Sequence, residues 1–258
     1  MMGLLGKVLR KSCGEFWGRK WNIQDVFTVA VFLGLHSLCA FAPFHFNWPA
    51  FWVAITLYVA TGLGITLCYH RSLAHRSFKL PKWLEYFFAY CGILSLQGSP
   101  IEWVSTHRYH HQFTDTEKDP HSPIKGLWFL GRTNFLHPIA VGVLLYVVGG
   151  FPFLVWGVGV RMVLVFHSTL LVNSIGHMWG KKAWNTGDMS RNNWWVALLA
   201  LGEGWHNNHH AFEYSARHGL EWWQIDFTWY IIRFLQAIGA ATNVKVPTEI
   251  QKQQKSFK

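Results

Sequence analysis

Histidine is the residue type whose placement in this sequence is most informative. Fifteen of the 258 residues are histidine, and nine of them lie in four short clusters. Two clusters share the spacing HxxHH, namely HRYHH at 107–111 and HNNHH at 206–210. The other two are HRSLAH at 70–75 and VNSIGH at 172–177. The clustered histidines are His70, His75, His107, His110, His111, His177, His206, His209 and His210.

The spacing of these residues predicts where imidazole groups converge. Positions i, i+3 and i+4 share one face of an α-helix, so each HxxHH motif predicts a single imidazole patch. Asn173 and His177 share a face for the same reason. His70 and His75 are five residues apart and converge only if the helix ends or bulges between them. Imidazole is the commonest metal ligand in proteins and suits iron, zinc and copper.

The number of histidines indicates more than one metal ion. About four to six ligands fill the shell of one ion, so nine imidazoles predict two ions. The four cysteines form no CxxC pair, which argues against a structural zinc site. Nearby carboxylates could orient the imidazole N–H groups, although each is equally compatible with a solvated surface position. The candidates are Glu102, Asp115, Glu117, Asp119 and Glu203.

Composition indicates the environment in which these residues work. Charged residues make up only 14% of the chain and hydrophobic residues 51%, whereas soluble proteins carry about 25% charged residues. A net charge of +10 could indicate nucleic acid as a partner. A basic chain this poor in charge is instead typical of a membrane protein, so we expect a lipid membrane and no nucleic acid.

Four apolar runs are long enough to span a membrane, which needs about 20 residues. They predict an all-α membrane protein with four transmembrane helices in two hairpins, 25–44 with 48–70 and 134–149 with 152–180. Two shorter apolar stretches, 83–97 and 194–202, predict interfacial or buried helices.

Charge bias predicts the orientation of these spans. With four spans, 22 of the 23 Lys and Arg residues fall on the side that holds both termini and residues 71–132. The positive-inside rule makes that side cytosolic, and all four histidine clusters lie there. Arg161 is the exception; we expect it to snorkel to the opposite interface, the alternative being a functional role. The chain is predicted to be one domain, 1–258, with a basic cytosolic segment at 1–23 and a frayed polar tail at 246–258.

The order HRSLAH, HRYHH and WHNNHH resembles the membrane-bound fatty acyl desaturases. The resemblance is closest to the delta-9-type group of plants and cyanobacteria, which is related to the stearoyl-CoA desaturases. Trp103, DPHSP at 119–123, LVNS at 171–174 and WWQID at 222–226 carry the same resemblance. It covers about residues 24–245.

This resemblance implies that the four spans carry a cytosolic helical cap, and that the cap houses a di-iron centre. One iron would be held by His70, His75, His107, His111 and His210. The other would be held by His110, His177, His206 and His209, with Asn173 ordering a bound water. The implied reaction uses O₂ and two electrons to place a cis double bond, delta-9-type, in a fatty acyl-CoA or acyl-lipid.

The resemblance also implies an external electron donor, either cytochrome b5 or ferredoxin. The sequence has neither a GxGxxG motif that opens a helix nor a haem-binding HPGG motif. Residues 1–23 look unlike a secretory signal or a plastid transit peptide. The endoplasmic reticulum, with both termini cytosolic, is therefore favoured over a plastid membrane.

The sequence departs from the family pattern at one place. Only eleven residues separate Pro123 from Phe135, where desaturases usually have a longer segment that builds part of the cap and the tunnel wall. No histidine of the four clusters is lost. Two alternatives to an active desaturase therefore stay open: a relative that hydroxylates lipids, and an inactive desaturase-like protein that binds lipid or modulates an active paralogue.

Overall fold

The computed structural model describes residues 23–116, 118–119 and 136–257. The predicted basic segment, apart from Ile23, and the shortened segment after Pro123 lie outside these ranges. The described chain is helical, with three isolated β-bridges and no sheet. The elements are α2 (Ile23–Ala40), η1 (Ala42–Phe44), α3 (Trp48–Leu63), η2 (Gly64–Ala74), α4 (Lys82–Ile93), α5 (Pro100–Phe113), α6 (Leu136–Leu154), η3 (Val155–Val160), α7 (Arg161–Met178), α8 (Trp194–Leu199), α9 (His206–Ala211), α10 (Phe227–Ala237) and α11 (Glu249–Lys255).

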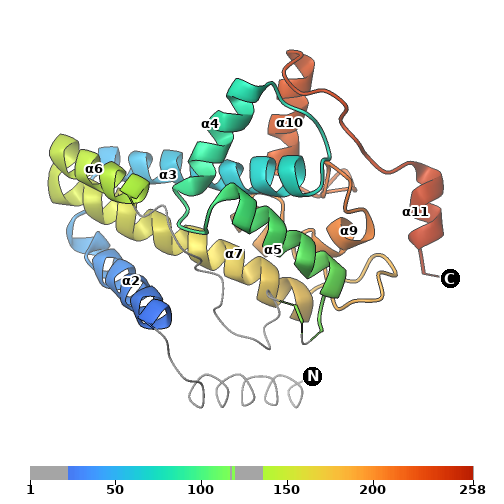
Figure 1. Cartoon of the computed structure of the whole chain (residues 1–258), viewed down its shortest axis with the longest axis horizontal. Coiled ribbons are helices and arrows are strands. Elements are labelled where there is room, and N and C mark those ends of the chain that lie inside the picture. The colour runs from blue at the N-terminus through green and yellow to red at the C-terminus, as the bar shows by residue number, and fades with distance from the viewer. Residues whose placement is uncertain (1–22, 117, 120–135, 258) are drawn as a thin grey trace.

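The helices form an apolar bundle at one end and a helical cap at the other (Figure 1). Helices α3 and α7 run lengthwise, with α6 at the bundle end and α5 and α9 at the cap end. Three segments are long and apolar enough to cross a membrane: Asp25–Phe44, Trp48–Ala74 and Leu136–Met178. Their bounds agree with the apolar runs predicted at 25–44 and 48–70. We use the term cap for α4, α5, α8, α9 and α10.

The third apolar segment reverses direction where the sequence predicts a turn. Gly150 has φ +65°, a left-handed conformation that favours glycine. On either side of it the chain packs against itself. A Cβ on Gly142 would lie 3.5 Å from Val158 Cγ2, and a Cβ on Gly157 would lie 2.7 Å from Leu145 Cδ1. The segment is therefore two antiparallel helical stretches, α6 and η3–α7.

Arg161 does not snorkel, so that expectation is wrong. Its side chain is buried, with the residue only 1% exposed. The guanidinium donates to Leu94 O at 2.9 Å and to Thr61 Oγ1 at 3.3 Å. Leu94 caps the C-terminus of α4, where carbonyl groups lack helical partners. Arg161 therefore fixes the end of α4 to the lengthwise helices.

Helix α4, which lies in a stretch predicted as an interfacial or buried helix, is buried along one face. One face packs on η2, and the contact is so close that the backbones nearly touch at Gly64 and Gly92. The opposite face exposes Trp83, Tyr86 and Phe87. The buried core beside this contact includes Leu67, Tyr69, Phe78, Trp103 and Ile232.

The C-terminal tail is more ordered than predicted. Residues 249–255 form α11, which begins with a capping box between Thr248 and Gln251. Asn185 N–H donates to Lys255 O at 3.0 Å and ties this helix to the cap. The expectation of a frayed tail is therefore wrong for these residues.

A methyl group at position 64 should disrupt the contact between η2 and α4. The Cβ of Gly64→Ala would lie 2.2 Å from Gly92 N and 2.6 Å from Cys91 C, and backbone atoms cannot rotate away. Overpacking costs about 1–3 kcal/mol, so we expect a lower melting temperature on fluorescence-detected gel filtration. Gly34→Ala is the control, because nothing lies within 4 Å of its added Cβ. Equal melting of the two variants would contradict the close contact.

Candidate metal centre

The first histidine box, the HRSLAH motif at 70–75, lies on a π-helix, η2. This helix type explains how His70 and His75 can converge although they are five residues apart. A π-helix bonds residue i to residue i+5, and His75 N–H donates to His70 O at 3.1 Å. The two rings are therefore brought together, with centroids 4.9 Å apart. The bulge that the spacing requires is present.

The second box lies on α5, whose N-terminus is capped by Ser99. Ser99 Oγ accepts from Glu102 N–H at 3.3 Å, and Glu102 Oε2 accepts from Ser99 N–H at 3.0 Å. Glu102 was a candidate partner of an imidazole, and that expectation is wrong. It completes a capping box instead.

The third box lies on α9, a helix too short to be stable alone. The two asparagines inside HNNHH hold it in place. Asn207 Oδ1 accepts from Trp184 N–H at 2.8 Å, and Asn208 Nδ2 donates to His218 O at 2.8 Å. These two side chains fix the helix so that its histidines face the opposite way, toward α5 and α7.

The nine histidines form two buried clusters, in each of which the ligand nitrogens lie within 4.8 Å of one another. The five-histidine cluster consists of His70, His75, His107, His111 and His209. The four-histidine cluster consists of His110, His177, His206 and His210. The structure gathers the nine predicted histidines into two groups, and it exchanges His209 and His210 relative to the grouping that the resemblance implies.

Helical geometry explains how the histidines of α5 and α9 divide between the two clusters. Within α5, His107 and His111 are an i, i+4 pair and share a cluster, while His110 turns to the other. Within α9, His206 and His210 are likewise an i, i+4 pair. His209, at i+3, crosses to the cluster of His107 and His111. Each helix therefore gives two imidazoles to one cluster and one to the other.

The imidazole nitrogens are spaced as metal ligands are. His75 Nε2 lies 2.8 Å from His107 Nε2, and His70 Nε2 lies 3.1 Å from His209 Nε2. In the other cluster His206 Nε2 lies 2.8 Å from that of His177. Nitrogens at right angles around an ion, with bonds of about 2.1 Å, are roughly 3 Å apart. Both clusters thus fit a metal ion on the Nε2 side.

Carboxylates accept a hydrogen bond from the opposite nitrogen of four of these rings. A carboxylate only accepts, so each of these partners places the hydrogen on Nδ1 and leaves the Nε2 lone pair facing the cluster. The pairs, with their Nδ1–oxygen distances, are His70–Glu203 (2.6 Å), His110–Asp119 (2.8 Å), His177–Asp115 (3.1 Å) and His210–Asp188 (3.0 Å). Glu213 lies 3.1 Å from His111 Nδ1 without hydrogen-bond geometry.

Three of the predicted carboxylate partners are confirmed, namely Asp115, Asp119 and Glu203. Glu117 lies outside the described residues. The sequence analysis missed Asp188 and Glu213. Glu213 follows the third box by three residues and could have been found by proximity. Asp188 lies in the loop between α7 and α8, and nothing in the local sequence links it to His210.

The buried guanidinium of Arg71 forms an ion pair with Glu203. Arg71 Nη2 donates to Glu203 Oε1 at 2.8 Å and to Asp226 Oδ1 at 2.9 Å. Burial alone would raise the pKa of Glu203, but Arg71 holds it well below the usual range. The carboxylate that orients His70 is therefore ionised.

Three of the clustered histidines on α5 and α9 are kept neutral. Burial holds the pKa of His107, His206 and His209 well below that of a free imidazole, and neighbouring imidazoles lower it further. Neutral imidazole is the form that binds a metal.

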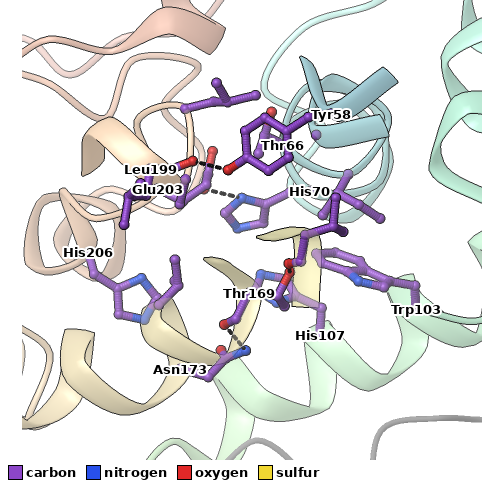
Figure 2. Close-up of a pocket in the computed structure, with 16 residues that line it drawn as sticks. Tyr58, Thr66, His70, Trp103, His107, Thr169, Asn173, Leu199, Glu203 and His206 are labelled. Atoms are coloured by element: carbon purple, nitrogen blue, oxygen red, sulfur yellow. Dashed lines mark hydrogen bonds and ion pairs between the residues drawn. The ribbon is translucent and has the colours of Figure 1, made fainter. Parts of the chain in front are cut away.

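An apolar pocket reaches both clusters (Figure 2). Its walls come from α3, η2, α5, α7 and the α8–α9 region, and His70, His107 and His206 lie at its surface. Asn173 lines it too, with its Nδ2 donating to Thr169 O at 3.2 Å within α7. The other lining residues are Tyr58, Gly62, Ile65, Thr66, Trp103, Val165, Thr169, Val172, Leu199, Ala200, Leu201 and Glu203.

Sequence reasoning missed two further features of the site. Gln97 links pocket walls, because its Nε2 donates to Thr169 Oγ1 at 2.8 Å. His218 is a tenth buried histidine, with its ring centroid 4.6 Å from that of His209 and its Nδ1 3.2 Å from Glu203 Oε2. It stands alone in the sequence as ARHGL, so no spacing signal marks it.

The helical bundle and the two imidazole clusters define an integral membrane protein with a histidine-rich di-metal site. A family profile described as fatty acid desaturase matches residues 46–138 and 124–241. The chain belongs to this family of membrane enzymes, which are O₂-dependent di-iron oxidoreductases.

Three plant proteins illustrate the similarity. The chain is 57% identical to a chloroplastic palmitoyl-monogalactosyldiacylglycerol delta-7 desaturase of Arabidopsis thaliana, over 97% of this chain and 76% of that protein. It is 56% identical to an icosanoyl-CoA 5-desaturase of Limnanthes douglasii, over 95% and 79%. It is 52% identical to the delta-9 acyl-lipid desaturase 1 of Arabidopsis thaliana, over 92% and 88%.

These comparisons also support the shortened internal segment. The alignment with the delta-7 desaturase has 284 columns but spans 97% of a 258-residue chain, so roughly 30 columns have no residue here. The family profile matches residues 124–138 twice, once from each side. The two matches meet at the place where the sequence analysis finds the segment short.

Acid should destabilise the metal-free protein. An unfolded histidine takes up a proton below about pH 6.5, whereas His107, His206 and His209 resist protonation while the chain is folded. The unfolded state therefore binds more protons, and each group removes about 1.4 kcal/mol of stability per pH unit as pH falls below about 6.5.

We expect the melting temperature of chelator-treated protein in detergent to be level above about pH 7 and to fall steadily toward pH 5. A melting temperature that is constant or rises over that interval would contradict neutral buried imidazoles.

Proposed function

We propose that this chain introduces one cis double bond into a saturated fatty acyl chain, using O₂ as co-substrate and two electrons. The observation that carries the proposal is the apolar pocket, whose surface includes His70 and His107 of one cluster and His206 of the other. An acyl chain bound there would lie beside both metal positions.

We propose that the five-histidine cluster holds one iron and the four-histidine cluster the other. Asn173, at the pocket surface, would order a water at the position with fewer imidazoles. When bound, the two irons supply the O₂ chemistry that removes two hydrogens from an unactivated chain.

The protein's own groups position the substrate and exclude water. Aliphatic side chains such as Ile65, Val165 and Val172 form walls that favour a hydrocarbon. The carboxylates behind the imidazoles hold the rings in one tautomer and orientation. The bond position then depends on how far the chain reaches past the histidines from its anchored head group.

The relatives suggest the substrate class but disagree on the bond position. Their names include a glycerolipid delta-7, an acyl-CoA delta-5 and an acyl-lipid delta-9 activity. We propose an acyl-lipid or acyl-CoA substrate and keep delta-9 as the first hypothesis. Delta-7 and delta-5 products are the alternatives that the same assay would reveal.

We propose four membrane crossings with both termini on the cytosolic side. The reversal at Gly150 and the presence of 22 of the 23 Lys and Arg residues in the segments assigned to the cytosolic side support this topology. That basic side suits an acidic electron donor, cytochrome b5 or ferredoxin. Because chloroplastic relatives match as well as the others, a plastid membrane is as compatible as the endoplasmic reticulum.

Expression in a yeast strain that lacks its own delta-9 desaturase tests the proposal. We expect a new monoenoic fatty acid on gas chromatography–mass spectrometry, and we expect His107→Ala to abolish it, because His107 contacts three rings of its cluster. His137→Ala is the matched control, since His137 lies on α6 and belongs to neither cluster. Equal product from His107→Ala and the parent would refute a catalytic cluster.

The shortened segment favours one other function, an inactive desaturase-like protein that binds lipid or modulates an active paralogue. The absence of product from a well-expressed chain would point to it. Insertion of the segment of a relative after Phe129 then separates the two ideas. Restored product would show that the short segment disables a competent site, whereas no product and no bound iron would support the inactive protein.

A further inference from the structure

The two histidine clusters differ in the charge behind them. In the four-histidine cluster, His110 contacts Asp119, His177 contacts Asp115 and His210 contacts Asp188. The side chains of Asp115 and Asp188 are 10% and 13% exposed. In the five-histidine cluster the corresponding contacts are to Glu203 and Glu213.

The negative charges of the carboxylates beside the five-histidine cluster are largely neutralised or screened. Arg71, fully buried, donates to Glu203 through two nitrogens, at 2.8 and 3.1 Å. The other carboxylate on Arg71, Asp226, is bound by backbone N–H groups, including those of His218 and Gly219. Glu213 is 49% exposed, so water and salt screen its charge.

Asp115 and Asp188 have no such compensation in the part of the chain that the structure describes. Among the described residues, no Lys or Arg lies within ion-pair distance of Asp115 or Asp188. Their remaining partners are neutral donors: Met189 N–H for Asp115, and Ser190 and Thr186 for Asp188. The negative charge behind these rings therefore acts on whatever occupies the cluster.

We propose that Asp115 and Asp188 make the four-histidine cluster the tighter of the two metal positions, so that one metal ion binds there before a second binds in the five-histidine cluster. The inference rests on the proposed function and deepens it. Loss of one partner behind a metal-bound imidazole typically lowers metal affinity 10- to 100-fold. Two uncompensated anions acting on a dication outweigh the one additional neutral imidazole of the five-histidine cluster.

The test is a metal titration of the full chain in detergent micelles. Chelator-treated protein is titrated with Zn²⁺, a redox-inert probe, against a chromogenic competitor. We expect two ions per chain, bound in two steps that differ at least about tenfold in affinity. His206→Ala removes a ligand of the four-histidine cluster and should abolish the tighter step while leaving the weaker one.

Asp188→Asn tests the charge itself, because the amide keeps the size and the acceptor oxygen. We expect the tighter step to weaken about 10- to 100-fold with the weaker step unchanged. Glu213→Gln is the matched control and should leave the tighter step unchanged. Asp115→Asn should give the same result as Asp188→Asn. It replaces Asp188→Asn if that variant does not run as a single peak on gel filtration.

The outcomes separate the inference from the proposed function. Two ions that bind with one affinity, or an Asp188→Asn chain that loses only the weaker step, would overturn the inference while keeping two metal positions. A folded parent chain that binds no Zn²⁺, or binding that His206→Ala leaves intact, would overturn the metal centre itself.

Discussion

Each metal cluster is assembled by an exchange of one imidazole between α5 and α9. His110 of α5 joins His206 and His210, while His209 of α9 joins His107 and His111. The exchange requires the two helices to face each other in one register, with His209 Nε2 2.9 Å from His111 Nε2. Neither cluster can form without placing most of the other, so the two metal positions are a single structural unit.

The rest of the cap is arranged to hold that register. A π-helix brings His70 and His75 together, and the asparagines of α9 fix a helix that has too few residues to stand alone. Arg71 ties the first box to Glu203 and Asp226 across more than 130 residues of sequence. Removal of one partner of such a buried ion pair typically costs about 3–5 kcal/mol, because a charge is left unpaired. Metal ligation and cap stability therefore depend on the same contacts.

Much of the site could be predicted because its signals are local. The HxxHH spacing, the five-residue interval of His70 and His75, and the turn at Gly150 all follow from helical geometry. The resemblance groups His209 with His206, whereas the i, i+4 spacing of His206 and His210 pairs those two. Which cluster each pair joins depends on how α9 faces α5, which no local spacing encodes. The roles of Asp188 and His218 could not be predicted from the sequence for the same reason, since each residue contacts its partner only through tertiary packing. Arg161 was misjudged because its partners, Leu94 and Thr61, come from other helices.

The central claim is that two buried imidazole clusters hold two irons beside an acyl pocket. Its most direct test is the iron content of monodisperse protein purified from iron-supplemented cells, with X-ray absorption at the iron edge. The account predicts close to two irons per chain in a shell dominated by imidazole nitrogen. A folded chain with less than one iron, or with sulfur ligands, would contradict it.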